Sequence, residues 1–181
     1  MPDTARLHVV TGGPGSGKTT LVEALAAAGV ATVPEAGRAI IRDQVTIGGR
    51  AVPWEDADLY AELMLARDLA AWRTAREAGR PVVLDRGLVD IAGYLTLIGQ
   101  EVPNHVRRAV ETCRYAPAVF IAPPWREIYG TDEERRQDWA EAVATHDAMV
   151  AAYTGAGYAL VPLPKAPVAE RVAFVRARIE P

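Results

Sequence analysis

The sequence predicts an α/β protein with three layers, in which a five-stranded parallel sheet carries helices on both of its faces. Short apolar runs rich in valine show little alternation between apolar and polar residues, as expected of strands that are covered on both sides. Segments with helical spacing separate these runs, and strands that alternate with helices form a parallel sheet through right-handed crossovers. The expected strands are 6–10, 30–33, 81–85, 117–122 and 158–163.

The segments between the strands predict the helices. Residues from Lys18 to Ala28 form the first, which ends at Gly29, because glycine readily adopts the left-handed backbone that closes a helix. The longest runs from Glu55 to Ala78, and its apolar residues recur at helical spacing up to Gly79. Further helices are expected at 36–45, 87–98, 104–112, 135–154 and 166–178.

Length and composition narrow the class of protein. The 181 residues, half of them hydrophobic and 24% charged, predict a single globular domain over 1–181. A net charge of −3 gives no general attraction to nucleic acid or to an anionic membrane, so neither is expected as a partner. No apolar run reaches the roughly 18 residues that span a bilayer. The N-terminus leads directly into the expected strand at 6–10, and the chain has one cysteine, Cys113, which together favour a cytoplasmic location. The oligomeric state stays open.

The segment after the first strand predicts a phosphate-binding loop. Its sequence is G-G-P-G-S-G-K-T-T, in which Gly12, Gly17, Lys18 and Thr19 satisfy the pattern G-x-x-x-x-G-K-[ST]. The glycines let backbone N–H groups turn inward, and the start of the next helix adds its positive end. Lys18 is expected to reach the β- and γ-phosphates of ATP, and the Thr19 hydroxyl is expected to bind Mg²⁺. The expected nucleotide-binding residues are Gly13, Pro14, Gly15, Ser16, Gly17, Lys18, Thr19 and Thr20.

A carboxylate and an arginine follow the second strand in the segment P-E-A-G-R. Ligands of parallel sheets bind outside the carboxyl ends of the strands, so Glu35 and Arg38 are candidates for the site. Glu35 can accept a proton from a substrate hydroxyl or hold a magnesium-bound water, and Arg38 can grip a second substrate. The alternative is a carboxylate that merely favours the helix start, with Arg38 as its solvated partner.

The third strand ends in L-D-R-G-L-V-D. Asp85 closes an apolar run, which is the usual position of an acid that binds magnesium directly or through water. Arg86 follows at the sheet edge as a candidate for gripping the second substrate, or as a structural ion pair. Asp90 lies one turn into the next helix, where a plain helix-start carboxylate is an equal possibility.

An arginine-dense segment follows the fourth strand and predicts a lid over about 123–137. Arg135 and Arg136 are expected to supply charge to the phosphates in the transition state. The same segment, T-D-E-E-R-R, also has the pattern of a helix start, and a lid can be a short helix.

Two further positions border the expected site. Trp54 and Tyr60 begin the long helix and are candidates for the wall of the acceptor pocket, although ordinary packing also explains them. After the fifth strand, Pro164 or Lys165 could touch the nucleotide base, but a simple connecting loop is the more economical interpretation.

Together these segments resemble the small bacterial P-loop proteins usually labelled AAA-family ATPases, along nearly the whole chain. The matching patterns are T-G-G-P-G-S-G-K-T-T at 11–20, P-E-A-x-R at 34–38, D-R-G-x-x-D at 85–90 and P-P-x-x-E-I-Y-x-T-D-x-E-R-R at 123–136. The group is similar to the ribosylnicotinamide kinase domain and, more loosely, to nucleoside and thymidylate kinases. The resemblance implies a P-loop NTPase fold of the nucleoside- and nucleotide-kinase type, with ATP and Mg²⁺ as ligands. It does not identify an acceptor.

Two classes of function fit these residues. The first is a kinase that transfers the γ-phosphoryl group of ATP to a nucleoside-, nucleotide- or metabolite-type acceptor, because the charged residues at consecutive strand ends exceed what hydrolysis needs. Its catalytic residues are expected to be Lys18, Glu35, Asp85, Arg135 and Arg136. The alternative is a regulatory or partner-coupled ATPase that hydrolyses slowly and uses its nucleotide state as a switch. The chain has no guanine-reading N-K-x-D motif, which favours ATP over GTP.

Overall fold

A five-stranded parallel sheet forms the centre of the computed structural model, which describes residues 4–129 and 138–179. The strands lie side by side in the order β2–β3–β1–β4–β5, and every neighbouring pair is parallel. The predicted parallel sheet is therefore confirmed. The strands are β1 (Leu7–Gly12), β2 (Ala31–Val33), β3 (Val82–Asp85), β4 (Ala118–Ala122) and β5 (Ala159–Pro162).

Seven α-helices and two short 3-10 turns connect the strands within the described residues. The turns are η1 (Thr4–Arg6) and η2 (Arg126–Ile128), neither of which the periodicity predicts. The α-helices are α1 (Lys18–Ala27), α2 (Ala36–Ile47), α3 (Ala57–Glu77), α4 (Leu88–Leu97), α5 (Asn104–Thr112), α6 (Trp139–Gly155) and α7 (Val168–Ile179).

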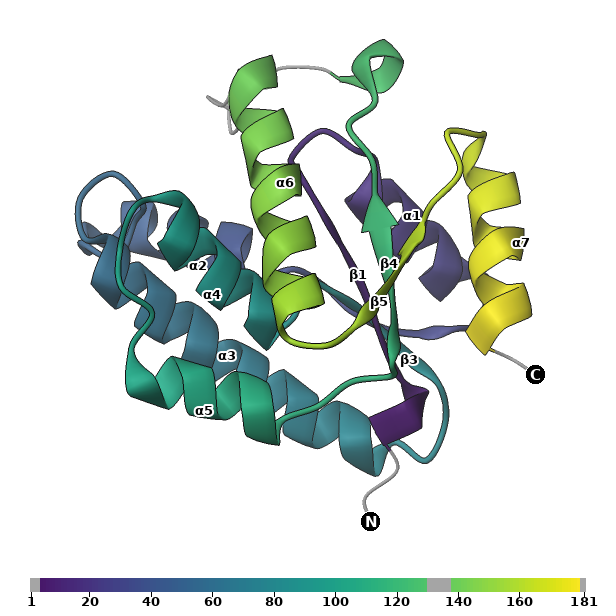
Figure 1. The fold of residues 1–181 in the computed structure, drawn as a ribbon, viewed down its shortest axis with the longest axis horizontal. Helices are drawn as coiled ribbons and strands as arrows, with labels where there is room; N and C mark the ends of the chain where they lie inside the picture. The colour runs from purple at the N-terminus through teal and green to yellow at the C-terminus, as the bar shows by residue number, and fades with distance from the viewer. Residues whose placement is uncertain (1–3, 130–137, 180–181) are drawn as a thin grey trace.

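The helices cover both faces of the sheet, which confirms the three-layer architecture. Figure 1 shows α1 and α7 on one side of the strands, with α3, α4 and α5 on the other. Leu21, Leu25 and Val175 from α1 and α7 belong to one buried apolar cluster. Leu65 and Ile91 from α3 and α4 belong to a second cluster on the opposite face. Helices on both faces thus bury apolar residues in clusters with the strands, and the strand ends carry polar residues.

Capping side chains explain where two helices differ from their expected bounds. Asp56 accepts a hydrogen bond from the backbone N–H of Leu59, so α3 begins at Ala57 rather than at 55. Asp138 and Glu141 form a reciprocal capping box, so α6 begins at Trp139 within the described residues. The expected helix start at 135 lies outside the described residues.

All the expected site segments that the structure describes follow the carboxyl ends of strands. The phosphate-binding loop follows β1, Glu35 follows β2, Asp85 ends β3, and Trp125 lies shortly after β4.

Within the described residues, no helix combines the length and the apolar character needed to cross a bilayer.

The apolar face of α4 should determine much of the stability. We expect Ile91→Ala to lower the free energy of unfolding by about 2–5 kcal/mol, because the side chain is fully buried and its removal leaves a cavity. Ile47→Ala, at a position that is 72% exposed, serves as the matched control and should change it by less than about 0.5 kcal/mol. Urea unfolding of both variants measures the difference, and equal losses would contradict this placement of α4.

Candidate functional site

The loop between β1 and α1 has the backbone that phosphate binding requires. Gly15 and Gly17 have φ angles of +70° and +75°, a left-handed conformation that side-chain-bearing residues rarely adopt. At Gly15 an added Cβ would also lie 2.5 Å from the Tyr129 ring, so the loop is closely covered at that point. The predicted glycine-rich loop therefore has the expected shape, with α1 beginning directly at Lys18.

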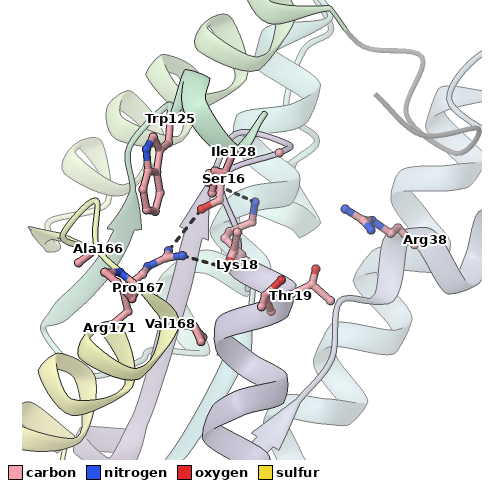
Figure 2. A pocket seen from close by; sticks show the side chains of 13 residues that line it. Ser16, Lys18, Thr19, Arg38, Trp125, Ile128, Ala166, Pro167, Val168 and Arg171 are labelled. Atoms are coloured by element: carbon pink, nitrogen blue, oxygen red, sulfur yellow. Dashed lines mark hydrogen bonds between the residues drawn. The ribbon is translucent and has the colours of Figure 1, made fainter. Parts of the chain in front are cut away.

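The Lys18 side chain folds back over this loop. Its Nζ donates to the carbonyl of Gly13 at 2.6 Å. It also donates to the Ser16 hydroxyl at 3.4 Å (Figure 2). Burial lowers the pKa of the Lys18 amine to about 8, and the nearby Arg86 guanidinium adds to this effect. An anion placed beside Lys18 would stabilise this buried positive charge.

A cavity of about 310 Å³ lies against the outer side of the loop. Its walls are the loop and the start of α1 on one side, and residues following β4 and β5 on the other (Figure 2). Arg38 enters this lining from α2, across the loop from Arg171. The lining residues are Gly15, Ser16, Gly17, Lys18, Thr19, Thr20, Arg38, Trp125, Ile128, Ala166, Pro167, Val168 and Arg171. The wall after β5 thus comes from 166–168 rather than from Pro164 or Lys165.

Arg171 is a component of this site that sequence patterns do not reveal. From α7 it donates to the carbonyl of Gly17 at 3.2 Å and to that of Ser16 at 3.3 Å. Its side chain is buried against the loop, and its guanidinium carbon lies 5.9 Å from the centre of the Trp125 ring. Arg171 therefore ties the last helix to the phosphate-binding loop and to the wall of the cavity.

On the other side of Lys18, a chain of charged groups joins the ends of β2 and β3. The Nε of Arg86 lies 3.2 Å from Glu35, and its Nη1 donates to Asp90 at 2.9 Å. Arg38 reaches the same Glu35 carboxylate at 3.6 Å. Burial alone would raise the pKa of the Glu35 carboxyl, but the neighbouring cations, above all Arg86 and Lys18, hold it below its usual value. Glu35 is therefore ionised at neutral pH.

Asp90 is the anchor of this chain rather than a plain helix-start carboxylate. Its Oδ1 accepts from the Thr11 hydroxyl at 2.6 Å and from Arg86, and its Oδ2 accepts from the Gly87 N–H and from the Tyr153 hydroxyl at 2.6 Å. Four donors, from β1, from the loop between β3 and α4, and from α6, thus converge on one buried carboxylate. Arg86 itself has a φ of +73°, a costly backbone conformation that such surroundings can hold.

Asp85 has the properties of a magnesium-binding carboxylate. Its side chain is buried at the end of β3, and its Oδ1 accepts no hydrogen bond from the described residues. Burial raises the pKa of Asp85 to about 6, although Lys18 opposes this shift. A buried oxygen without a donor is suited to a cation or its water. Thr19 stands at the first turn of α1 and lines the cavity, and its role toward magnesium stays a prediction, as does that of Asp85.

Two tyrosines and a close helix contact form the wall beyond Glu35. The rings of Tyr60 and Tyr94 pack edge to face at 5.7 Å, and the Tyr94 hydroxyl is buried without a hydrogen bond within the described residues. An added Cβ at Gly37 would lie 2.5 Å from the Tyr60 hydroxyl, so glycine allows α2 to approach α3 here. Tyr60 therefore borders the Glu35 side of the site.

The structure gathers some of the expected residues and leaves others apart. Electrostatic interactions connect Lys18, Glu35, Asp85 and Arg86, as the strand-end positions predicted. Trp54 is 62% exposed, so its role in a pocket wall stays a prediction. Arg135 and Arg136 lie outside the described residues, as does most of the expected lid.

Asp68 on α3 is a second residue that the sequence did not reveal. It interacts electrostatically with Asp90, Glu35 and Arg86, and it follows Tyr60 and Met64 at intervals of four residues along one helix face. Burial and the nearby carboxylates raise the pKa of Asp68 to about 7. Helical periodicity alone could have placed it on the Tyr60 face, but nothing in the sequence indicates which face meets Glu35.

Solved structures with a similar fold include two that are named as kinases. The NadR protein in complex with NR superimposes with a TM-score of 0.68 at 18% identity, over 98% of this chain and 52% of that chain. The chain thus spans about half of that relative. Deoxyadenosine kinase from M. mycoides, with products dCMP and dCDP, gives a TM-score of 0.65 at 10% identity over 96% and 98% of the two chains.

Thymidylate kinase from Ehrlichia chaffeensis gives a TM-score of 0.63 at 12% identity, over 98% of this chain and 99% of that chain. At these identities the similarity establishes the fold, which is the three-layer fold of P-loop nucleoside and nucleotide kinases. No curated protein sequence matches this chain. A family model described as an AAA domain, AAA_28, matches residues 7–171. The expected resemblance is thus confirmed, and the chain belongs to the AAA_28 family.

Proposed function

We propose that the protein is a small-molecule kinase that transfers the γ-phosphoryl group of ATP to an acceptor hydroxyl. The observation that carries this proposal is the Glu35–Arg86–Asp90 chain beside Lys18. It places an ionised carboxylate and a fixed guanidinium at the ends of β2 and β3, whereas Trp125 and Arg171 line the cavity from the β4 and β5 side of the loop, and Arg38 reaches both regions. Hydrolysis of ATP requires a binding site for the nucleotide alone. Transfer of the phosphoryl group also requires a binding site for the acceptor, and these residues could form one.

The donor side would hold ATP. Backbone N–H groups of the loop bind the phosphates, and Lys18 moves from the Gly13 carbonyl to the β- and γ-phosphates. The cavity bordered by Trp125 and Arg171 is the place for the base, with 166–168 as its opposite wall. Thr19 and Asp85 would hold Mg²⁺, which supplies positive charge to the phosphate oxygens when it is bound.

The acceptor side would supply the nucleophile. The acceptor oxygen forms a bond to the γ-phosphorus, the bond from phosphorus to the β–γ bridging oxygen breaks, and ADP leaves. The proton of the acceptor hydroxyl passes to Glu35, which is ionised and can accept a hydrogen bond from it. Arg86 is fixed by Asp90 and orients Glu35, while Arg38 reaches the same carboxylate from α2. Arg135 and Arg136 stay candidates for charge stabilisation at the phosphates.

Acceptor-dependent release of ADP tests the proposal. We expect at least one compound of a panel of nucleosides, nucleotides and other hydroxyl metabolites to accelerate ADP release from Mg·ATP well above the rate in water. If no small molecule does so while a partner protein does, the protein is a partner-coupled ATPase and the proposal is wrong.

Lys18→Ala should lower the rate of ADP release at least about 100-fold, because it removes the charge that faces the transferred phosphoryl group. Lys165→Ala is the matched control, since Lys165 is exposed beyond β5, and it should keep the wild-type rate. Circular dichroism should show both variants folded. A Lys18→Ala variant that retains activity would refute the assignment of the loop.

Glu35→Gln should lower the rate of acceptor phosphorylation by about 10²–10⁴-fold, because the amide cannot accept the hydroxyl proton. Binding of ATP, measured by calorimetry, should change little because Glu35 lies on the acceptor side. The control is Glu62→Gln, an exposed carboxylate of α3 that pairs with His105. Equal losses of ATP binding and transfer in Glu35→Gln would count against the base.

Asp85→Asn should raise the Mg²⁺ concentration that gives half-maximal ADP release by about tenfold or more, because an amide is a weaker ligand. Its thermal stability should not fall, since the buried Asp85 Oδ1 has no hydrogen-bond donor to lose within the described residues. Asp58→Asn, at an exposed position of α3, should alter neither quantity. An unchanged Mg²⁺ requirement would remove Asp85 from the metal site.

A further inference from the structure

The arginines around Glu35 indicate whether the acceptor already carries a phosphate group when it binds. This inference rests on the proposed kinase function. A site that receives a phosphorylated acceptor needs arginine or lysine side chains whose charge is still available. A phosphate monoester brings about 1.5–2 negative charges at neutral pH, and these must be matched by cations when the group is buried. The arginines that follow β2 and β3 can be examined for such spare charge.

The positive charge of Arg86 is already paired with carboxylates. It lies between two carboxylates, with Glu35 at 3.2 Å from its Nε and Asp90 at 2.9 Å from its Nη1. Asp90 cannot turn away, because Thr11, Gly87 and Tyr153 also donate to it. Burial disfavours the charged guanidinium, but the two carboxylates outweigh this and raise the pKa of Arg86. An incoming phosphate would therefore compete with carboxylates that are already in place.

Arg38 pairs with the Glu35 carboxylate as well. Its Nε lies 3.6 Å from the second oxygen of Glu35, so one carboxylate pairs with two guanidinium groups. Glu35 itself makes no capping bond to α2, and its side chain is free to serve these pairs. The four groups Glu35, Arg38, Arg86 and Asp90 thus carry no net charge.

Additional carboxylates make this side of the site acidic. Asp85 lies beside Lys18, and Asp68 interacts with both Glu35 and Asp90 from the Tyr60 face of α3. Two more arginines of this region are paired at the surface, Arg50 with Asp56 at 3.0 Å and Arg67 with Asp43 at 2.6 Å.

We propose that the acceptor carries no phosphate group, and that Glu35 excludes phosphorylated acceptors by neutralising Arg86 and Arg38. The acceptor is then a neutral or cationic hydroxyl compound, whose apolar part fits beside the Tyr60–Tyr94 pair and whose hydrogen-bond donors face Asp68. The reaction adds the first phosphoryl group to this compound. Its product is an anion that the same carboxylates repel, which favours its release.

Calorimetric titration with inorganic phosphate tests the proposal without turnover. The donor site is first filled with Mg²⁺ and a non-hydrolysable ATP analogue, so that phosphate cannot enter the glycine-rich loop. The wild-type protein should then show no measurable phosphate binding. Glu35→Gln and Glu35→Ala should bind phosphate about tenfold more tightly than the wild type or better, because each removes the carboxylate that pairs with Arg38 and one of the two that pair with Arg86, which leaves one positive charge unbalanced.

Asp43→Asn is the matched control, because it also frees an arginine, Arg67, but at an exposed pair between α2 and α3. It should not create a phosphate site. Phosphate binding by the wild type would overturn the proposal, and so would the absence of any gain in both Glu35 variants. Unchanged binding of the ATP analogue verifies that these variants are folded.

The proposed kinase function fails by a different result. It is wrong if the ATP analogue does not bind, or if no acceptor accelerates ADP release. If a nucleoside 5′-monophosphate accelerates ADP release and the matching nucleoside does not, the protein is a kinase. In that case only the inference about the acceptor is wrong.

Discussion

The hydrogen bonds that converge on the buried Asp90 carboxylate hold together the region proposed to bind the acceptor. A carboxylate out of contact with water is tolerated only when donors satisfy its oxygens. Here Thr11 of β1, the Gly87 backbone, Arg86 and Tyr153 of α6 supply four donors. Because these donors come from β1, from the loop before α4 and from α6, the bonds tie these three elements to Asp90 of α4.

That constraint reaches the candidate chemistry through Arg86. The guanidinium that Asp90 fixes is also the partner of Glu35, so the position of α4 sets the position of the carboxylate that follows β2. On the donor side, Arg171 has a corresponding role, because it ties α7 to the carbonyls of Ser16 and Gly17. Lys18 lies between the two sides and bonds to its own loop. The groups held by Asp90 and the loop held by Arg171 therefore both lie next to the Lys18 amine. This arrangement suits a reaction between two substrates.

Local patterns made the fold and the nearer part of the site predictable. The glycine-rich loop, Glu35, Asp85 and Arg86 are recognisable because each directly follows an apolar strand, and parallel strands bring their carboxyl ends to one edge. The contacts of Asp90, and the presence of Asp68 and Arg171 in the site, required the structure. Arg171 is 155 positions from Ser16 along the chain, and Tyr153 is 63 positions from Asp90. No local spacing encodes such contacts, because they depend on how whole helices pack on the sheet.

The fate of a labelled γ-phosphoryl group tests the two-substrate interpretation most directly. ATP labelled in that group would be incubated with Mg²⁺, the protein and a small-molecule extract, and the products would be separated by mass spectrometry. The arrangement of Glu35, Arg86 and Lys18 predicts that the label appears in an organic phosphate monoester formed from a previously unphosphorylated hydroxyl compound. Label found solely in inorganic phosphate, at the same rate with and without the extract, would contradict it.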